Sequence, residues 1–259
     1  MKFEYTWTGN WAGAMCGMRH AMKSHGRADS MMMTWVGDRG TCGDPRDTSM
    51  PIISETSFGN KDVVVYFYIG DNDMKLCQNL ILASKGGKVL ESEDKPFYDL
   101  IKEDGNAAHT KFLRQIFVSV DITAPRYFWQ EMDTYKVDTT ANSESTMHTI
   151  LKDEISLDCL EPYMYECDSA NDDDDIILQD VINRMKFIRD DSRYSDLCKT
   201  QRIKAMIPES WLQKRHWSAS YATVRNAYHQ RKHHRLPQWN THFANWVKSL
   251  PYAAELICN

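Results

Sequence analysis

Residues 124–148 read Ala124-Pro-Arg-Tyr-Phe-Trp-Gln-Glu-Met-Asp-Thr-Tyr-Lys-Val-Asp-Thr-Thr-Ala-Asn-Ser-Glu-Ser-Thr-Met-His148, the densest cluster of polar side chains beside aromatic ones in the chain. Pro125 predicts the start of a helix, because proline is tolerated in a helix's first turn. Thr139–Ser143 predicts the end of that helix and an irregular or extended continuation. The stretch therefore predicts a helix followed by a strip of hydroxyl and amide groups.

This strip can build a binding site with aromatic walls and a floor of hydroxyl, amide and ammonium groups. Its candidates for holding a phosphate or carboxylate are Lys136, Asn142, Ser143 and Ser145. Its candidates for stacking on a flat ring are Tyr127, Trp129 and Tyr135. In the alternative interpretation the aromatic residues are helix core and the small polar ones are turn residues. Composition alone favours this alternative.

The flanking sequence predicts further helices and strands. Val63–Ile69 is β-branched and aromatic throughout, which predicts a strand. The side chains of Gly70-Asp-Asn-Asp73 are suited to cap a following helix that ends near Gly86-Gly87. The charged stretch 88–105 predicts a surface insertion, and the alternation in Phe117–Ile122 predicts a half-buried strand.

Composition excludes several classes of protein. A hydrophobic fraction of 42% with 8 Trp, 12 Tyr and 9 Phe excludes a disordered chain, because burial of this much apolar surface stabilises a folded core. The longest apolar run, Val63–Ile69, is far shorter than the roughly 20 residues needed to cross a bilayer. The start of the sequence lacks the apolar core of a secretory signal. The 7 Cys form no CxxC pair, which predicts reduced thiols. We expect a cytoplasmic protein without a membrane segment.

Charge is segregated along the second half of the chain, although the net charge is only −5. Residues 153–180 are rich in Asp and Glu and contain no Lys or Arg, and the run Asn171–Asp175 predicts a solvated loop rather than a calcium site. Residues 204–235 are strongly basic. They could bind nucleic acid or a small phosphorylated ligand, or neutralise the acidic segment. Without a linker or repeat, we expect one main domain, preceded by an irregular region over residues 1–60.

The order of residues after Pro125 resembles the signature of flavin-dependent thymidylate synthases, the ThyX-like family. That signature has a Pro-led aromatic helix, Arg-Gln, Arg-His-Arg, and an Asn-Glu-x-Ser-x-Arg-Tyr tail. These parts fall on Gln130-Glu131, Thr134-Tyr-Lys136 and Asn142–His148. In the C-terminal third, Ile207-Pro-Glu-Ser210 and Asn226-Ala-Tyr-His-Gln-Arg231, followed by Gln238-Trp239, resemble the family's later motifs. The resemblance covers about residues 73–256.

The resemblance implies an α+β fold over residues 61–259, an antiparallel sheet flanked by helices, in a homotetramer. It implies FAD as cofactor, with NADPH and methylenetetrahydrofolate as co-substrates, and reductive one-carbon transfer to a pyrimidine nucleotide such as dUMP. It assigns catalysis to Lys136 and Ser145. It assigns nucleotide binding to Lys136, Asn142, Ser143, Ser145 and Arg231, and flavin contact to His109, Thr134, Tyr135 and Asn226.

The departures from the signature leave two functions open. Thr134 and Tyr135 stand where the family has Arg-His, and Lys136 keeps a cation that cannot make a planar bidentate fork. Glu131 replaces a glutamine, and Met147-His148 replace Arg-Tyr. The first interpretation is a divergent flavoenzyme. The second is a non-catalytic protein that binds or sequesters a nucleotide on the same fold, and nucleic-acid binding through residues 204–235 is a weaker third.

Overall fold

The computed structural model describes residues 1–20, 27–42, 44–47, 51–58, 60–85, 110–162 and 173–259. Its helices and strands are, in chain order, β1 (Lys2–Gly9), α1 (Trp11–His20), β2 (Met31–Gly37), η2 (Pro45–Asp47), β3 (Ile52–Phe58), β4 (Lys61–Tyr68), α2 (Asp71–Ser84), α4 (Phe112–Gln115), β5 (Phe117–Pro125), α5 (Arg126–Met132), β6 (Thr139–Ser143), α6 (Thr146–Thr149), η4 (Leu157–Cys159), α7 (Asp173–Asp190), α8 (Asp196–Lys204), β7 (Leu212–Ser220), α9 (Tyr221–Arg231), the π-helical η5 (Gln238–Phe243), α10 (Ala244–Lys248) and the π-helical η6 (Ala254–Cys258).

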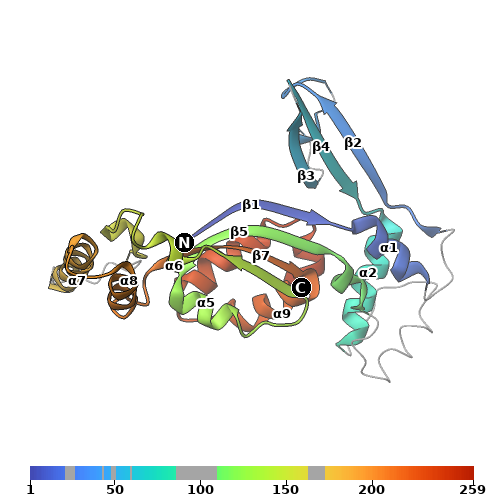
Figure 1. Cartoon of the computed structure of the whole chain (residues 1–259). Coiled ribbons are helices and arrows are strands. Elements are labelled where there is room, and N and C mark those ends of the chain that lie inside the picture. Colours follow the sequence, from blue (N-terminus) through green and yellow to red (C-terminus); the bar gives the residue numbers. More distant parts are fainter. Residues whose placement is uncertain (21–26, 43, 48–50, 59, 86–109, 163–172) are drawn as a thin grey trace. The chain divides into compact units, whose positions relative to one another are not determined.

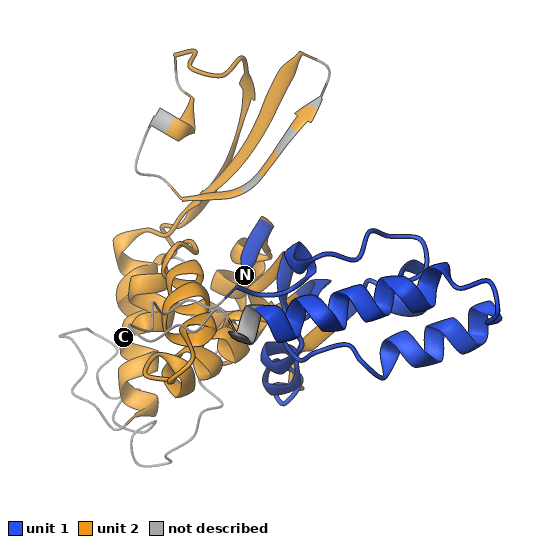
Figure 2. Cartoon of the chain, turned by 90° about the vertical axis from the view of Figure 1, so that its left-hand side faces the viewer, with its two compact units in different colours: residues 1–4, 121–135, 141–217 blue, residues 5–120, 136–140, 218–259 orange. Residues whose placement is uncertain are grey.

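The chain forms two compact units that interleave along the sequence (Figure 2). Unit 1 comprises residues 1–4, 121–135 and 141–217, and unit 2 comprises residues 5–120, 136–140 and 218–259. The expected boundary at residue 60 falls inside unit 2, so it does not separate these units. The prediction of one main domain missed this division because each unit is assembled from segments far apart in sequence.

Two antiparallel sheets flanked by helices make up the architecture, which confirms the predicted fold class. The four-stranded sheet has the order β1-β5-β7-β6. Its strand β5 contains the predicted strand Phe117–Ile122 and alternates as expected, with Val118, Val120 and Ile122 fully buried. Helix α5 begins directly after Pro125, close to the predicted start, and Pro125 is its N-cap with extended backbone rather than a residue of the first turn. The strip Thr139–Ser143 is the extended strand β6.

The region before residue 60 is not irregular, and this prediction was wrong. It supplies β1 to the four-stranded sheet and β2 and β3 to a three-stranded sheet in which β4 lies between them (Figure 1). Both pairings are antiparallel, with Met33 opposite Tyr66 and Glu55 opposite Val64. The sequence did not reveal β2 because its residue types do not alternate: Met31-Met-Met33 are apolar in succession, although exposure alternates along the strand from Met32 onward.

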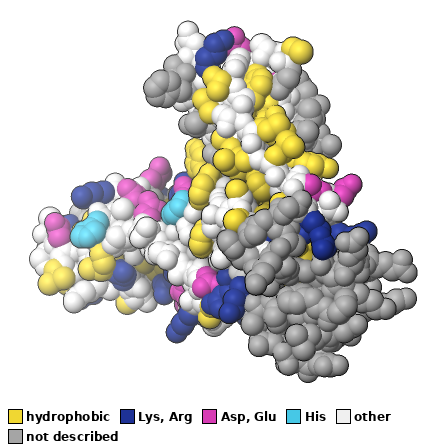
Figure 3. Space-filling model, turned by 90° about the vertical axis from the view of Figure 1, so that its right-hand side faces the viewer, with side chains coloured by type: hydrophobic (Ala, Val, Ile, Leu, Met, Phe, Trp, Pro, Cys, Tyr) yellow, Lys and Arg dark blue, Asp and Glu magenta, His cyan; other side chains and the backbone are white. Residues whose placement is uncertain are grey.

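The three-stranded sheet carries large exposed hydrophobic side chains, seen as yellow atoms in the upper part of Figure 3. They are Met31, Met32, Val36 and Tyr68. None of these residues lines either of the two pockets described below.

Helix α2 forms where predicted but is capped differently. Its N-cap is Gly70, which makes no side-chain hydrogen bond. Instead the distant Asp29 accepts from the backbone N–H groups of Asn72 and Asp73, at 2.9 Å and 3.0 Å. A Cβ at position 70 would collide with the Asp29 carboxylate, so only glycine allows this approach.

Unit 1 has its own hydrophobic core between α7 and α8. It comprises Ile150, Ile155, Leu160, Ile182, Met185, Ile188, Ile203 and Trp211. Helix α7 begins at Asp173, so the last three aspartates of the run Asn171–Asp175 are helical rather than the predicted loop. Negative charge is favoured in a helix's first turn, where the backbone N–H groups give a positive end.

Two features of the described residues concern the cellular setting of the protein: membrane-spanning helices and cysteines. Among the described residues, none of the helices has the length and apolar character to span a bilayer. The cysteines that the structure describes are free thiols: Cys16, Cys42, Cys77, Cys159, Cys198 and Cys258.

Candidate functional site

The predicted site residues fall in both units. Unit 1 contains Thr134, Tyr135, Asn142, Ser143 and Ser145, and unit 2 contains Lys136, Asn226 and Arg231. The expected flavin contact His109 and the charged stretch 88–105 lie outside the described residues. The assignment of these residues to one nucleotide and flavin site stays a prediction.

Four of the residues assigned to the nucleotide present open polar groups. Lys136, Asn142, Ser143 and Ser145 are exposed, and within the described residues their side chains make no hydrogen bond or ion pair. Ser145 precedes α6 without capping it through its side chain. Their hydroxyl, amide and ammonium groups are therefore available to a ligand.

The flavin-assigned residues are less open. The Thr134 hydroxyl donates to the carbonyl of Glu131 at 2.7 Å. Tyr135 is only 8% exposed. Asn226 is exposed, and its side-chain oxygen accepts from Gln230 at 2.9 Å. The described residues thus fit a flavin poorly, because a ring-stacking surface at Tyr135 is covered.

The aromatic residues of α5 are core rather than walls of a site. Trp129 is 1% exposed and its indole Nε1 donates to the carbonyl of Gln213 at 3.0 Å. The guanidinium carbon of Arg215 lies 4.4 Å from a Trp129 ring centroid, so one ring face is already occupied. Tyr127 is half-buried, and burial raises its pKa to about 12. Trp129 therefore fits the alternative interpretation, in which the aromatic residues of this helix belong to the core.

A polar network crosses β5 and β7 in unit 1. The Asp121 carboxylate lies 2.7 Å from Nδ1 of His216 and 3.1 Å from Nζ of Lys214. The hydrogen bond from His216, helped by Lys214, lowers the pKa of Asp121. This carboxylate is held ionised and orients the imidazole ring, as a carboxylate does for a general base.

Unit 1 also contains a basic pocket of about 240 Å³. Its cations are Arg126, Lys204 and Arg215, from α5, α8 and β7. Its remaining lining residues are Gln130, Asp133, Thr146, Ile207, Trp211 and Gln213. Sequence reasoning placed Lys204 and Arg215 in the basic segment 204–235 but did not connect Arg126 with them, because about 80 residues separate Arg126 from the other two. Strand alternation does place Gln213 and Arg215 on one face of β7, which was the available signal.

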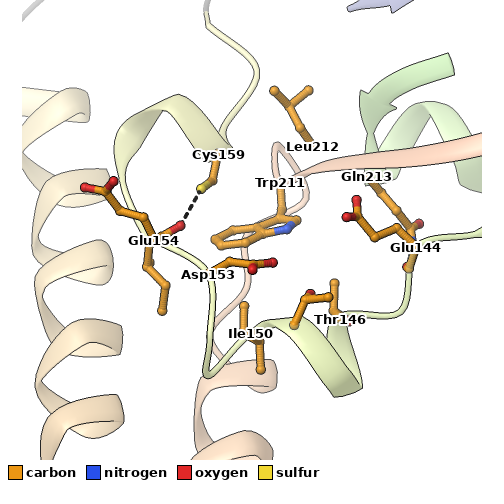
Figure 4. Close-up of a pocket in the computed structure, with 11 residues that line it drawn as sticks. Glu144, Thr146, Ile150, Asp153, Glu154, Cys159, Trp211, Leu212 and Gln213 are labelled. Atoms are coloured by element: carbon orange, nitrogen blue, oxygen red, sulfur yellow. Dashed lines mark hydrogen bonds between the residues drawn. The ribbon is translucent and has the colours of Figure 1, made fainter. Parts of the chain in front are cut away.

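An acidic pocket of about 160 Å³ shares Thr146, Trp211 and Gln213 with the basic one. Figure 4 shows the Trp211 ring in the middle of its lining, with Asp153 beside it. Its charged residues are Glu144, Asp153 and Glu154, so a phosphate would be repelled here. Within the part of the chain that the structure describes, no group of His, Cys, Asp and Glu is arranged to hold a metal ion.

Comparison with known proteins identifies the fold. No protein-family model and no curated protein matches the sequence. A crystal structure of thymidylate synthase X (ThyX) from Helicobacter pylori with FAD and dUMP is similar over 100% of this chain and 98% of that chain, with a TM-score of 0.58 and 13% identity. A second structure of that enzyme with FAD and dUMP covers 70% of this chain and 94% of its own, with a TM-score of 0.45 and 16% identity.

Proposed function

We propose that this chain, which has a ThyX-like fold, binds a pyrimidine nucleotide, with dUMP as the first candidate, through Lys136, Asn142, Ser143, Ser145 and Arg231. The observation that carries the proposal is the set of exposed side chains of Lys136, Asn142, Ser143 and Ser145, whose polar groups have no partner within the described residues. The H. pylori structure, which has this fold, contains dUMP and FAD.

In its full form the proposal is FAD-dependent, reductive one-carbon transfer to dUMP, with NADPH and methylenetetrahydrofolate as co-substrates in a homotetramer. Lys136 and Ser145 would orient the nucleotide, and catalysis would rest on positioning. Bound flavin would supply the redox chemistry. Of the residues assigned to it, Thr134 and Tyr135 offer a flavin few open groups.

The second candidate function is nucleotide binding or sequestration without catalysis. Two observations favour it: the Thr134 hydroxyl donates to the carbonyl of Glu131 in α5, and Tyr135 is buried. Neither observation affects the side chains assigned to the nucleotide. Binding and catalysis are therefore separable questions in this protein.

Absorption spectroscopy and nucleotide titration test the proposal together. A flavoenzyme purifies with, or takes up, FAD and absorbs in the flavin region, whereas a colourless protein that binds dUMP but not FAD is the non-catalytic form. Ser145→Ala is expected to weaken dUMP binding about tenfold, because one hydrogen bond to a charged group is lost. Arg231→Ala is expected to weaken it as well.

Two controls sharpen this titration. Thr139→Ala changes a hydroxyl in β6, the strand that ends two residues before Ser145, and Thr139 is not assigned to the ligand, so dUMP affinity should stay as in the wild type. Affinity that is unchanged in both Ser145→Ala and Arg231→Ala would place the nucleotide elsewhere. A salt series separates this proposal from nucleic-acid binding, whose affinity falls steeply with ionic strength.

A further inference from the structure

Helix α7 of unit 1 carries an exposed stripe of apolar and charged side chains. Ile176 is 55% exposed, Ile177 is 60% exposed and Phe187 is 52% exposed. Asp180 and Arg184 lie between them along the helix and are exposed as well. Single exposed apolar residues need no partner, but a row of them on one helix face is typical of an interaction surface.

The stripe has the spacing of a seam between packed helices. Its members follow one another at intervals of three, four and three residues, as the a and d positions of a heptad repeat do: Ile177, Asp180, Arg184 and Phe187. The other side of α7 is already used within unit 1, where the helix packs against α8 (Figure 1). That side contributes Ile182, Met185 and Ile188 to the hydrophobic core. The stripe is therefore a second packing face of the same helix.

The two charges in the stripe are not neutralised locally. Within the described residues, neither Asp180 nor Arg184 forms an ion pair or a hydrogen bond. They are four residues apart and could pair along the helix. Instead the guanidinium carbon of Arg184 lies 5.1 Å from the ring centroid of Phe187. Both charges are available to an opposite charge on another molecule.

The stripe is complementary to a second copy of itself. Ile177 and Phe187 lie five residues on either side of Ile182, and Asp180 and Arg184 lie two residues on either side of it. Two antiparallel helices related by a two-fold axis near Ile182 place residues that are equally far from this centre opposite each other. Ile177 then faces Phe187 of the partner subunit, and Asp180 faces Arg184 of the partner subunit.

We propose that α7 pairs antiparallel with α7 of a second copy of this chain, in a two-fold contact. The apolar layers supply the burial that stabilises the pair. The two aspartate–arginine layers fix its register, a role that polar and ionic groups take at helix-packing positions. The contact does not rest on the proposed function, because none of its residues is assigned to the nucleotide or the flavin.

Other occupants of the stripe fit less well. Helix α7 contains five acidic and three basic residues, a net charge of −2, whereas helices that lie on membranes are rich in Lys and Arg on their polar face. A different protein would not require the stripe to be complementary to itself. The order of charges and apolar residues thus favours a second copy.

Charge reversal tests the contact, with sedimentation of the full chain in the absence of nucleotide and flavin as the readout. The wild type is expected to self-associate. Asp180→Arg and Arg184→Asp are each expected to weaken association about tenfold or more, because each variant sets like charges opposite each other at two places in the pair. An equal mixture of the two variants is expected to associate as the wild type does, since the arginines of one then face the aspartates of the other. A role within a single chain cannot produce recovery on mixing.

Matched controls complete the test. Lys186→Asp reverses a charge on α7 outside the stripe and should leave association unchanged. Ile177→Ser is expected to weaken association about tenfold, whereas Leu197→Ser, at a residue of α8 that is 65% exposed, should not. A monomeric wild type, reversals without effect, no recovery on mixing, or equal losses in the two serine variants overturns the proposal. None of these outcomes depends on whether the chain binds dUMP.

Discussion

Asp73 is fully buried in the first turn of α2, and several donors share its carboxylate. Its Oδ1 accepts from Nε of Arg19 at 2.6 Å, and its Oδ2 accepts from the backbone N–H groups of Asp29 and Ser30 at 3.2 Å and 3.0 Å. A buried charge is tolerated only when it is paired and hydrogen-bonded. This one side chain ties α1 and the segment before β2 to the start of α2.

Replacing Asp73 by alanine should be severely destabilising. The change leaves the Arg19 guanidinium buried without its carboxylate partner, so we expect a loss of about 3–5 kcal/mol in the free energy of unfolding. Urea denaturation measures this loss. Asp71→Ala, in the same helical turn but exposed, is the matched control and should cost much less. Similar losses in the two variants would contradict the role given to the buried pair.

At the scale of elements, α9 holds the C-terminal π-helical turn η6 through polar contacts. The His229 ring nitrogen Nε2 lies 2.9 Å from the Ile257 carbonyl, and Nη1 of Arg225 donates to the carbonyls of Leu256 and Ile257 at 2.9 Å and 2.7 Å. The neutral imidazole donates its Nε2 hydrogen in this arrangement. Burial, followed by the charge of Arg225, lowers the pKa of His229.

This lowered pKa predicts a pH dependence of stability. The unfolded chain takes up a proton on His229 near pH 6.5 while the folded protein still resists it. Stability is therefore highest above about pH 6.5 and falls as the pH drops through the lower pKa of the folded state. His229→Gln keeps an N–H donor and removes the titration. We expect a smaller loss of stability between pH 7 and pH 5 than in the wild type.

Thermal unfolding across this pH range measures the effect. His233→Gln changes an exposed histidine just beyond the same helix and should retain the wild-type pH dependence. If His229→Gln showed the full wild-type loss, the contact between α9 and η6 would not be the origin of the pH dependence.

At the scale of the whole molecule, each unit depends on aromatic and aliphatic residues from distant parts of the chain. In unit 2, Trp11 is 1% exposed and its ring lies 6.0 Å from Phe67, 5.1 Å from Tyr221 and 5.6 Å from Tyr252. The indole also donates to the Thr8 hydroxyl at 3.1 Å. One side chain thus joins α1, β4, α9 and the turn before η6.

Trp11→Ala is expected to lower the free energy of unfolding by about 3–5 kcal/mol, because a large cavity replaces these contacts. Trp7→Ala is the control, since Trp7 is 46% exposed and should cost far less. Chemical denaturation followed by circular dichroism compares the two variants. A small effect at Trp11 would mean that unit 2 does not depend on this aromatic cluster.

The sequence alone was sufficient to predict the helices and strands that carry a clear local signal. The predicted strands became β4 and β5, and the predicted helices became α2 and α5, because local propensity and tertiary burial agree there. The order of polar residues after Pro125 also led to the fold class, and Ser145 and its neighbours are exposed as a ligand-binding role requires.

Only the tertiary structure decided how distant segments combine. Asp29 caps α2 across more than 40 residues, β1 joins β5, and Arg126, Lys204 and Arg215 meet in one pocket. Trp129 was a candidate wall of the site in the sequence, but in the structure it is buried and Arg215 stacks on its ring. The physical reason is that periodicity records which face of an element is buried, whereas partner choice depends on contacts between segments that no local pattern encodes.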